Sequence, residues 1–184
     1  MAQLDRVFAA ADGMEVTLQA DGAYATDPLF AGRLCRTLAY TGMHISVLSG
    51  GWREENGRLA MYQPPIDSSA IRDGFLYWRR PKNKRAIALP IKREIEPWLG
   101  SFLDQPKPRS SRRYHQLLAE VGKAARLQVN PLRFRHTCGV ILYHVLGLDA
   151  AQVQTLLGVT PGTMLTYVVH TKDQVRTEMM EKGW

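Results

Sequence analysis

The sequence predicts an α+β domain that is mainly helical and carries a small three-stranded antiparallel sheet. Three observations favour this class. Apolar residues recur at helical spacing in the first and last parts of the chain. Between them lie three short segments in which β-branched and aromatic residues alternate with polar ones. The 184 residues, 45% of them hydrophobic, suffice to bury a sizeable core, so we expect a single domain over residues 1–184.

The N-terminal part is predicted to contain two helices. The first spans Leu4–Ala11. The segment Met14–Thr26 has no clear period, so we expect a loop or an extended arm there. Asp27-Pro28 then begins a helix that runs to about Tyr40, because proline suits a first helical turn, and Thr41-Gly42 ends it.

The three predicted strands are Gly57–Tyr62, Gly74–Arg80 and Arg85–Leu89. A loop containing Pro64-Pro65 separates the first two strands, and Pro81–Lys84 is the tight turn between the last two. We expect these three segments to form the antiparallel sheet.

Three helices are predicted after the sheet. The first spans Glu94–Leu103, and the second runs from a capping serine at position 110 or 111 to about Leu127. The third begins with Asn130 as its cap and Pro131 in its first turn, because these residues suit those positions. Gly147 ends it.

The C-terminal part is predicted to hold further helical segments. Asp149 caps a helix over Ala150–Leu157, and Gly158 ends it. After a Pro-Gly turn, an apolar segment carries Tyr167. Thr171–Lys182 has the pattern of a final amphipathic helix.

The net charge of +7 and a pI near 9.6 favour a polyanionic partner, with nucleic acid first. The alternative is a domain whose basic charge has no functional role. Three clusters of cations point instead to patches for the phosphate backbone of double-stranded DNA. Their members are Arg79, Arg80, Lys82, Lys84 and Arg85; Lys107, Arg109, Arg112 and Arg113; and Arg133 and Arg135.

Membrane and secreted classes are disfavoured by the sequence. No apolar run approaches 18 residues, and the N-terminus does not read as a signal peptide. Cys35 and Cys138 stand in apolar helical contexts, so we expect buried free thiols in a reducing cytosol. We therefore expect a cytoplasmic protein that associates with DNA.

Four stretches stand in a fixed order along the chain. Thr41–Leu48 reads TGMHISVL, and Arg135-His136-Thr137 lies in the predicted third helix after the sheet. Leu156-Leu157-Gly158 and Tyr167 follow. In this order, and at nearly this spacing, they resemble the motifs of the tyrosine recombinases, the phage integrase family. The resemblance implies the catalytic-domain fold of that family from end to end, without its separate N-terminal DNA-clamping domain. The chain is then either naturally short or a fragment.

The resemblance also implies a chemistry that needs neither metal nor cofactor. Tyr167 corresponds to the nucleophile that attacks a phosphodiester to give a 3′-phosphotyrosine, its alternative being an ordinary core or surface tyrosine. Arg135 corresponds to the second arginine of the clamp on the transition state. Lys82 corresponds to the general acid for the leaving 5′-oxygen, with Lys84 as the alternative. His44 stands where the family has its first catalytic arginine.

Three donors of the family site are replaced here. His44 takes the place of the first arginine, Leu132 that of the box histidine, and Val159 that of the histidine or tryptophan after Leu-Gly. His136 is expected to point off the active face and not to substitute for them. Removing one transition-state donor typically costs ~10²–10³ in rate. Loss or weakening of strand transfer is therefore expected.

Three functions follow from these observations. The leading hypothesis is an integrase-family DNA-binding protein of a mobile element, linked to integration or recombination, whose strand-transfer activity is lost or weak. The second is an active, divergent tyrosine recombinase. The third is a protein–protein adaptor on the same fold, in which Asp173–Trp184 mediates self-association or binds an active recombinase.

Overall fold

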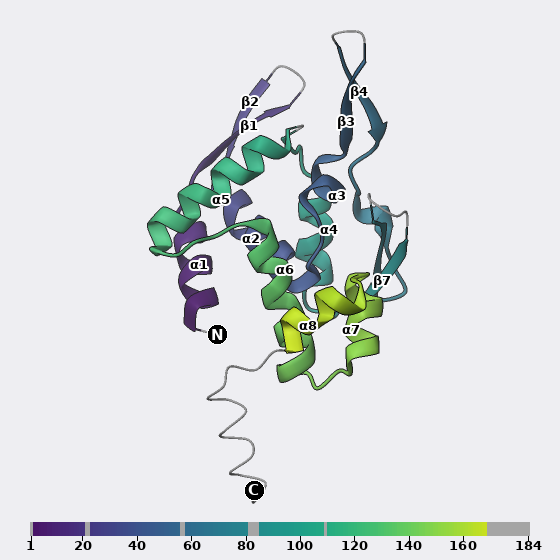
Figure 1. Cartoon of the computed structure of the whole chain (residues 1–184). Helices are drawn as coiled ribbons and strands as arrows, with labels where there is room; N and C mark the ends of the chain where they lie inside the picture. Colours follow the sequence, from purple (N-terminus) through teal and green to yellow (C-terminus); the bar gives the residue numbers. More distant parts are fainter. Residues whose placement is uncertain (1, 21–22, 56–57, 81–84, 109, 169–184) are drawn as a thin grey trace, which may run out of the picture.

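The computed structural model describes residues 2–20, 23–55, 58–80, 85–108 and 110–168. Within this part, the chain is mainly helical with small antiparallel sheets, which confirms the predicted class (Figure 1). The helices are α1 (Ala2–Asp12), α2 (Phe30–Thr41), α3 (Ile45–Ser49), α4 (Glu96–Asp104), α5 (Ser111–Ala125), α6 (Pro131–Val140), α7 (Ala150–Leu157) and α8 (Pro161–Val168).

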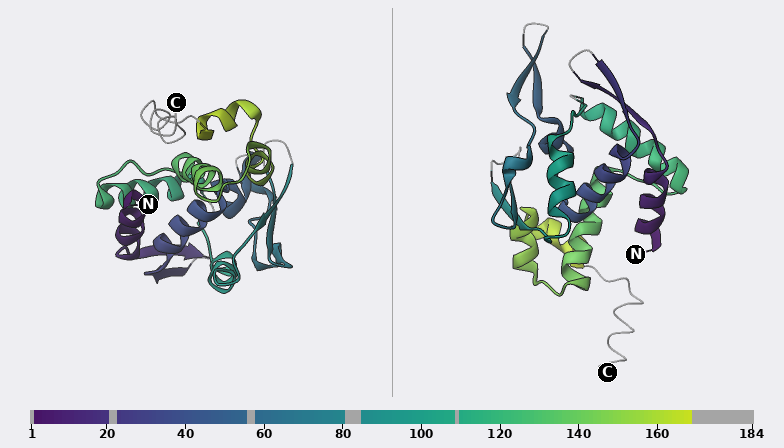
Figure 2. Two further views of the ribbon diagram at one scale, coloured as in Figure 1. Left: turned by 90° about the horizontal axis from the view of Figure 1, so that it is seen from below. Right: turned by 180° about the vertical axis from the view of Figure 1, so that it is seen from behind.

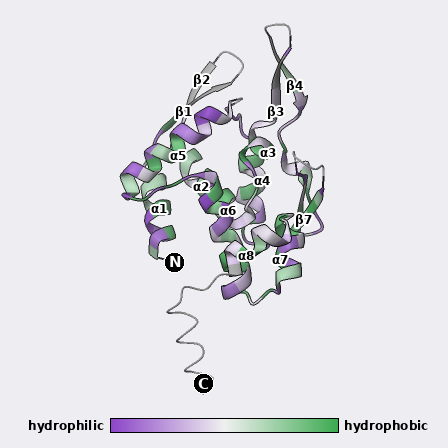
Figure 3. Ribbon diagram, in the orientation of Figure 1, coloured by the Kyte–Doolittle hydropathy of each residue, from purple (hydrophilic) through white to green (hydrophobic). Residues whose placement is uncertain are grey.

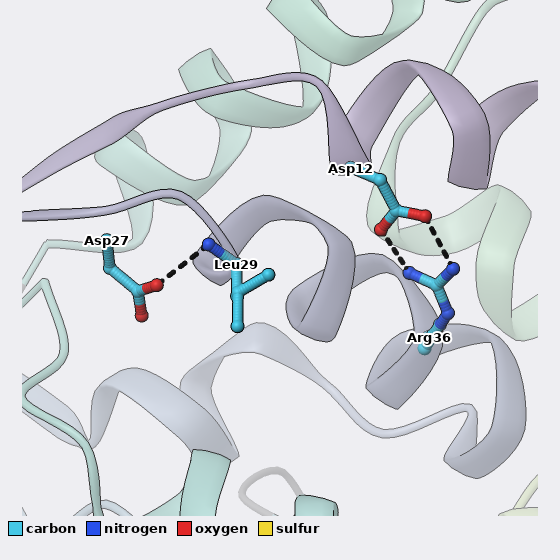
Figure 4. Close-up of polar contacts among 4 residues, drawn as sticks. All are labelled: Asp12, Asp27, Leu29 and Arg36. Carbon is cyan, nitrogen blue, oxygen red and sulfur yellow. Dashed lines mark hydrogen bonds and ion pairs between the residues drawn. The ribbon is translucent and has the colours of Figure 1, made fainter.

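Helix α2 lies at the centre of the molecule, between α1 and α5 on one side and the β5–β7 sheet on the other (Figure 2). Phe30, Leu34 and Leu38 are fully buried on it. The Asp27 carboxylate accepts a hydrogen bond from the Leu29 backbone N–H at 2.8 Å just before the helix (Figure 4). This explains why the predicted start of the helix is nearly right.

The three-stranded sheet consists of β5 (Ile71–Arg72), β6 (Phe75–Arg79) and β7 (Ala86–Pro90), all antiparallel. The last two strands confirm the prediction. The first predicted strand was assigned to the wrong sheet: β4 (Arg58–Gln63) pairs with β3 (Gly51–Glu55) in a separate hairpin. Local composition marks a strand, but its partner is decided by contacts between distant segments.

The segment Met14–Thr26, expected to be a loop or an extended arm, instead contributes the hairpin of β1 (Val16–Ala20) and β2 (Ala23–Asp27). This hairpin and the β3–β4 hairpin project from the same end of the molecule (Figure 1). The helices α7 and α8 lie at the opposite end, with α7 packed beside β7.

The helix boundaries after the sheet follow the predicted caps. The Asn130 side chain accepts a hydrogen bond from the Arg133 N–H at 2.9 Å, and α6 continues into a π-helical turn, η2 (Ile141–Val145). Asp149 and Gln152 form a reciprocal capping box on α7. The predicted final helix, Thr171–Lys182, and the proposed adaptor segment lie outside the described residues.

Two clusters of buried side chains form the core. The larger one surrounds α2 and includes faces of α1, α4 and α5, and Figure 3 shows hydrophobic and hydrophilic residues alternating around α5. The smaller one joins α6, α7 and α8 through Cys138, Leu142, Val153, Leu157, Val159, Met164 and Tyr167. Both cysteines are buried and free, as expected. Tyr167 is thus fixed by core packing.

Candidate phosphate-binding site

Arg135 lies at the centre of the candidate site. Only 5% of its surface is exposed. Its Nη1 donates to the carbonyl oxygen of Gly42 at 2.6 Å, and its Nη2 donates to the carbonyl oxygen of Leu157. Burial lowers the pKa of Arg135, although a guanidinium keeps its charge at neutral pH. This one side chain therefore joins the ends of α2 and α7.

Arg80 approaches the same end of α7. It follows strand β6, where its backbone N–H donates to the carbonyl oxygen of Arg85 at 2.8 Å. Its Nη1 donates to the carbonyl oxygen of Gly158, the residue after Leu157. The two guanidinium groups are thus held by consecutive carbonyls at the C-terminus of a helix, where the helix dipole favours cations.

His44 caps the N-terminal end of α3 and is half-buried. Burial, reinforced by the charges of Arg135 and Arg80, lowers its pKa to about 4. The imidazole is therefore neutral at pH 7. Its buried Nε2 has no hydrogen-bond partner among the described residues. His44 thus lies near both arginines but adds no positive charge.

Tyr167 on α8 completes the cluster. It is 3% exposed, and its hydroxyl lies close enough to Arg135 for the guanidinium charge to act on it. Burial raises its pKa, and Arg135 opposes that effect. Its ring lies against Gly139, where an added Cβ would come within 2.7 Å of the Tyr167 Cδ2. The neutral hydroxyl is therefore the stable form of this side chain.

His136, which was expected to point off the active face, is exposed and lines the same groove as Leu132. Its ring meets the edge of the Tyr167 ring, with centroids 5.3 Å apart and planes at 80°. Its Nε2 also lies 3.0 Å from the carbonyl oxygen of Thr166. The side chain is exposed and contacts the aromatic ring, while the hydroxyl of Tyr167 meets Arg135.

Val159 and Leu132, two positions where the resemblance implied a lost donor, contribute no polar group. Val159 is 4% exposed and belongs to the smaller core cluster. Leu132 is 74% exposed and lines a groove of about 620 Å³ between α1 and α6. That groove lies on another face of α6 from Arg135.

The remaining predicted DNA contacts are spread over several elements. Arg79 ends strand β6, Arg85 precedes β7, Arg112 and Arg113 lie in the first turn of α5, and Arg133 in the first turn of α6 donates to Gln128 Oε1 at 2.6 Å. All five are exposed. The candidate general acids Lys82 and Lys84 lie outside the described residues, as does Arg109. Within the described part of the chain, no group of three or more His, Cys, Asp or Glu side chains is placed to hold a metal ion.

The sequence singled out Arg135, Tyr167 and His44, which the structure places near one another, but gave Arg80 only a role in a surface patch. Strand alternation is the signal that could have found it, because Arg80 continues the face of Leu76 and Trp78, both buried. The close approach of Gly139 to Tyr167 has no local signal in the sequence.

Comparison with known proteins shows the fold. No family model matches the sequence, and no curated protein matches it significantly. Among solved structures, the XerA recombinase has a TM-score of 0.68 at 18% identity over 100% of this chain and 64% of its own. XerH site-specific recombinase bound to a palindromic difH substrate has a TM-score of 0.62 at 15% identity, over 98% and 52% of the two chains.

The Tn1549 transposon integrase in complex with transposon right end DNA is also similar, with a TM-score of 0.58 at 16% identity over 98% of this chain and 64% of its own. The chain therefore spans between about half and two thirds of the lengths of these recombinase chains. No described helix is long and apolar enough to cross a membrane. The chain has the fold of the catalytic domain of the tyrosine recombinases.

Proposed function

We propose that this chain binds duplex DNA, is linked to the integration or recombination of a mobile element, and has lost or weakened strand-transfer activity. The observation that carries the proposal is the convergence of Arg135, Arg80 and Tyr167 at the end of α7. Guanidinium groups match phosphate oxygens with paired, charge-assisted hydrogen bonds. The fold is one in which XerH and the Tn1549 integrase have been seen with DNA.

The exposed arginines support a broad contact with the DNA backbone. Arg79 ends β6, Arg85 precedes β7, and Arg112 and Arg113 lie in the first turn of α5. Contacts of this kind position a protein on DNA without reading its sequence. We therefore infer affinity for duplex DNA in general. We also propose that the protein acts in the cytoplasm.

The composition of the cluster supports weak chemistry. Val159 and Leu132 cannot donate hydrogen bonds, and neutral His44 offers at most one where an arginine would offer two with a charge. Arg135 already donates to two backbone carbonyls. Loss of one transition-state donor typically lowers the rate by ~10²–10³, although several such losses do not multiply simply.

Equilibrium binding of a fluorescent duplex, measured by anisotropy over a salt series, tests the proposal. We expect log Kd to rise linearly with log salt concentration, because binding releases counterions. The double variant Arg112→Gln/Arg113→Gln removes two proposed contacts and should reduce the slope by about two. The control, Lys92→Gln/Arg93→Gln, removes the same charge from another exposed site and should leave the slope nearer the wild-type value. Absence of binding at low salt would contradict the proposal.

An active recombinase is the second candidate. The proximity of Tyr167 to Arg135 favours it, because it brings a nucleophile next to a group that could bind the phosphate. In this reaction the Tyr167 hydroxyl loses its proton and its oxygen bonds to phosphorus. The bond between phosphorus and the 5′-oxygen breaks, and the 5′-oxygen takes up a proton. Cleavage of a DNA site that disappears in Tyr167→Phe would favour this candidate over the first.

A further inference from the structure

We propose that Arg80 and Arg135 together form a two-guanidinium clamp for a single phosphodiester, with Arg80 replacing the arginine that His44 has displaced. The inference rests on the proposed function, since the phosphodiester would belong to bound DNA. Arg80 would then bind one defined phosphate next to the Tyr167 hydroxyl, and would not be only part of a surface patch for the DNA backbone.

The geometry that carries the inference is the pair of consecutive carbonyls at the end of α7. Arg135 donates to the carbonyl of Leu157 and Arg80 to that of Gly158. Hydrogen bonds to adjacent carbonyls hold both guanidinium groups at the same end of α7 and restrict their rotamers. Both side chains are thus ordered in the free protein, so that ligand binding need not include the entropic cost of ordering them.

Strand alternation explains why Arg80, and not Arg79, reaches this position. Leu76 and Trp78 are buried on the face of β6 that packs inward, and Arg80 continues that face. Arg79 occupies the opposite face and is exposed. Gly158 allows strand β7 to pack closely against the end of α7, because a Cβ at that residue would lie only 2.6 Å from the Ile87 Cδ1. The Arg80 Cδ would lie at an ordinary contact distance of 3.7 Å from it.

The charges of the cluster favour an anion. Arg80 and Arg135 repel each other, and within the described residues neither is paired with a carboxylate. The Arg80 Nε is buried and has no hydrogen-bond partner among those residues, and the same holds for His44 Nε2. Buried donors are normally satisfied. A phosphate oxygen supplies both the acceptor and the negative charge.

Binding of inorganic phosphate to the full chain, measured by calorimetry, tests the clamp. Arg80→Gln keeps a donor for the Gly158 carbonyl but removes the charge and the fork. A hydrogen bond to a charged group is worth about 1.5–3 kcal/mol, so phosphate affinity should fall by about tenfold to a hundredfold. The matched control Arg93→Gln removes the same charge from an exposed residue outside the proposed DNA contacts, and should retain the wild-type affinity.

Equal losses in Arg80→Gln and Arg93→Gln would overturn the inference, as would a wild-type protein that does not bind phosphate. If Arg80→Gln does not fold, the comparison of Arg80→Lys with Arg93→Lys decides the question. A loss confined to position 80 supports the fork, and equal affinities refute it. Duplex binding is measured on the same samples. If the wild type does not bind phosphate but still binds duplex DNA, only the clamp is rejected. If the wild type does not bind duplex DNA at all, the proposed function is rejected.

Discussion

Arg135 and Gly42 are 93 residues apart in sequence, yet the Arg135 Nη1 donates to the Gly42 carbonyl oxygen at 2.6 Å. Gly42 adopts a left-handed conformation (φ 58°) at the end of α2, only two residues before His44. A Cβ there would also come within 2.8 Å of the Leu157 Cδ2. The contact therefore fixes the α2–α3 turn against α7, and one buried arginine holds the site together before any ligand binds.

Substitution of Arg135 by methionine should destabilise the fold. It leaves the buried carbonyls of Gly42 and Leu157 without their donor, and each unpaired group costs about 1–3 kcal/mol. We expect a loss of roughly 2–4 kcal/mol in the free energy of unfolding, measured by urea denaturation. The control Arg133→Met, on the exposed side of the same helix, should change it by less than about 0.5 kcal/mol. Equal effects would show that Arg135 does not hold the turn.

Gly139→Ala should disturb Tyr167. The new methyl group would lie 2.7–2.9 Å from three atoms of the tyrosine ring, so the ring or α6 must move. Overpacking of this kind costs about 1–3 kcal/mol, which urea denaturation would detect. Gly162→Ala is the matched control, because no atom lies within 4 Å of the added Cβ in the first turn of α8. A neutral Gly139→Ala would mean that the ring is not confined by α6.

His44 should make stability depend on pH in the acid range. The unfolded chain takes up its proton near pH 6.5, whereas burial and the two arginines lower the pKa in the folded protein to about 4. The contribution of neutral His44 to the free energy of unfolding is therefore fully present above pH 6.5 and is lost as pH falls from about 6.5 to 4.

Thermal unfolding over this pH range checks the effect. His44→Gln, which has no titrating group, should lose less stability than the wild type between pH 7 and pH 4.5. His115→Gln, an exposed histidine on α5, is the control and should follow the wild type. Identical curves of stability against pH for the wild type and His44→Gln would show that the His44 imidazole is solvated in the folded protein.

The ion pair of Asp12 with Arg36 should contribute little despite its bidentate geometry. Its N–O distances are 2.5 and 2.7 Å (Figure 4), but 32% of the Arg36 side chain and 47% of the Asp12 side chain are exposed. Exposed pairs contribute about 0.2–1 kcal/mol. We expect Asp12→Asn to cost less than about 1 kcal/mol in urea denaturation, with the difference shrinking at high salt. A loss that salt does not change would point to packing of Arg36 on Phe8.

The sequence predicts local features well. Asn130, Asp149 and Gly158 mark helix ends through contacts with neighbours one to four residues away, and all three prove correct. The two hairpins also have local signals. Ala20 pairs with Ala23 and Glu55 with Arg58, so that two residues separate the strands in each case. In the sequence these are Asp-Gly and Asn-Gly, dipeptides typical of tight hairpin turns.

Features that depend on distant segments were beyond sequence reasoning. Strand β4 was assigned to the wrong sheet because pairing is decided in three dimensions. The contact of His136 with the Tyr167 ring depends on where α8 packs against α6, and no local pattern encodes that. The meeting of Arg80 with the end of α7 joins residues 78 positions apart.

A nicked duplex carrying the attachment site of the element, incubated with the protein and run on native and denaturing gels beside Tyr167→Phe, tests the central claim most directly. The nick lets a cleaved fragment leave, so that a covalent phosphotyrosyl product would accumulate. The account predicts a native shift that fades with salt in both proteins, with no covalent band or only a faint one. A strong covalent band that disappears in Tyr167→Phe would show an active recombinase and contradict the loss of strand transfer. No shift at low salt would contradict DNA binding itself.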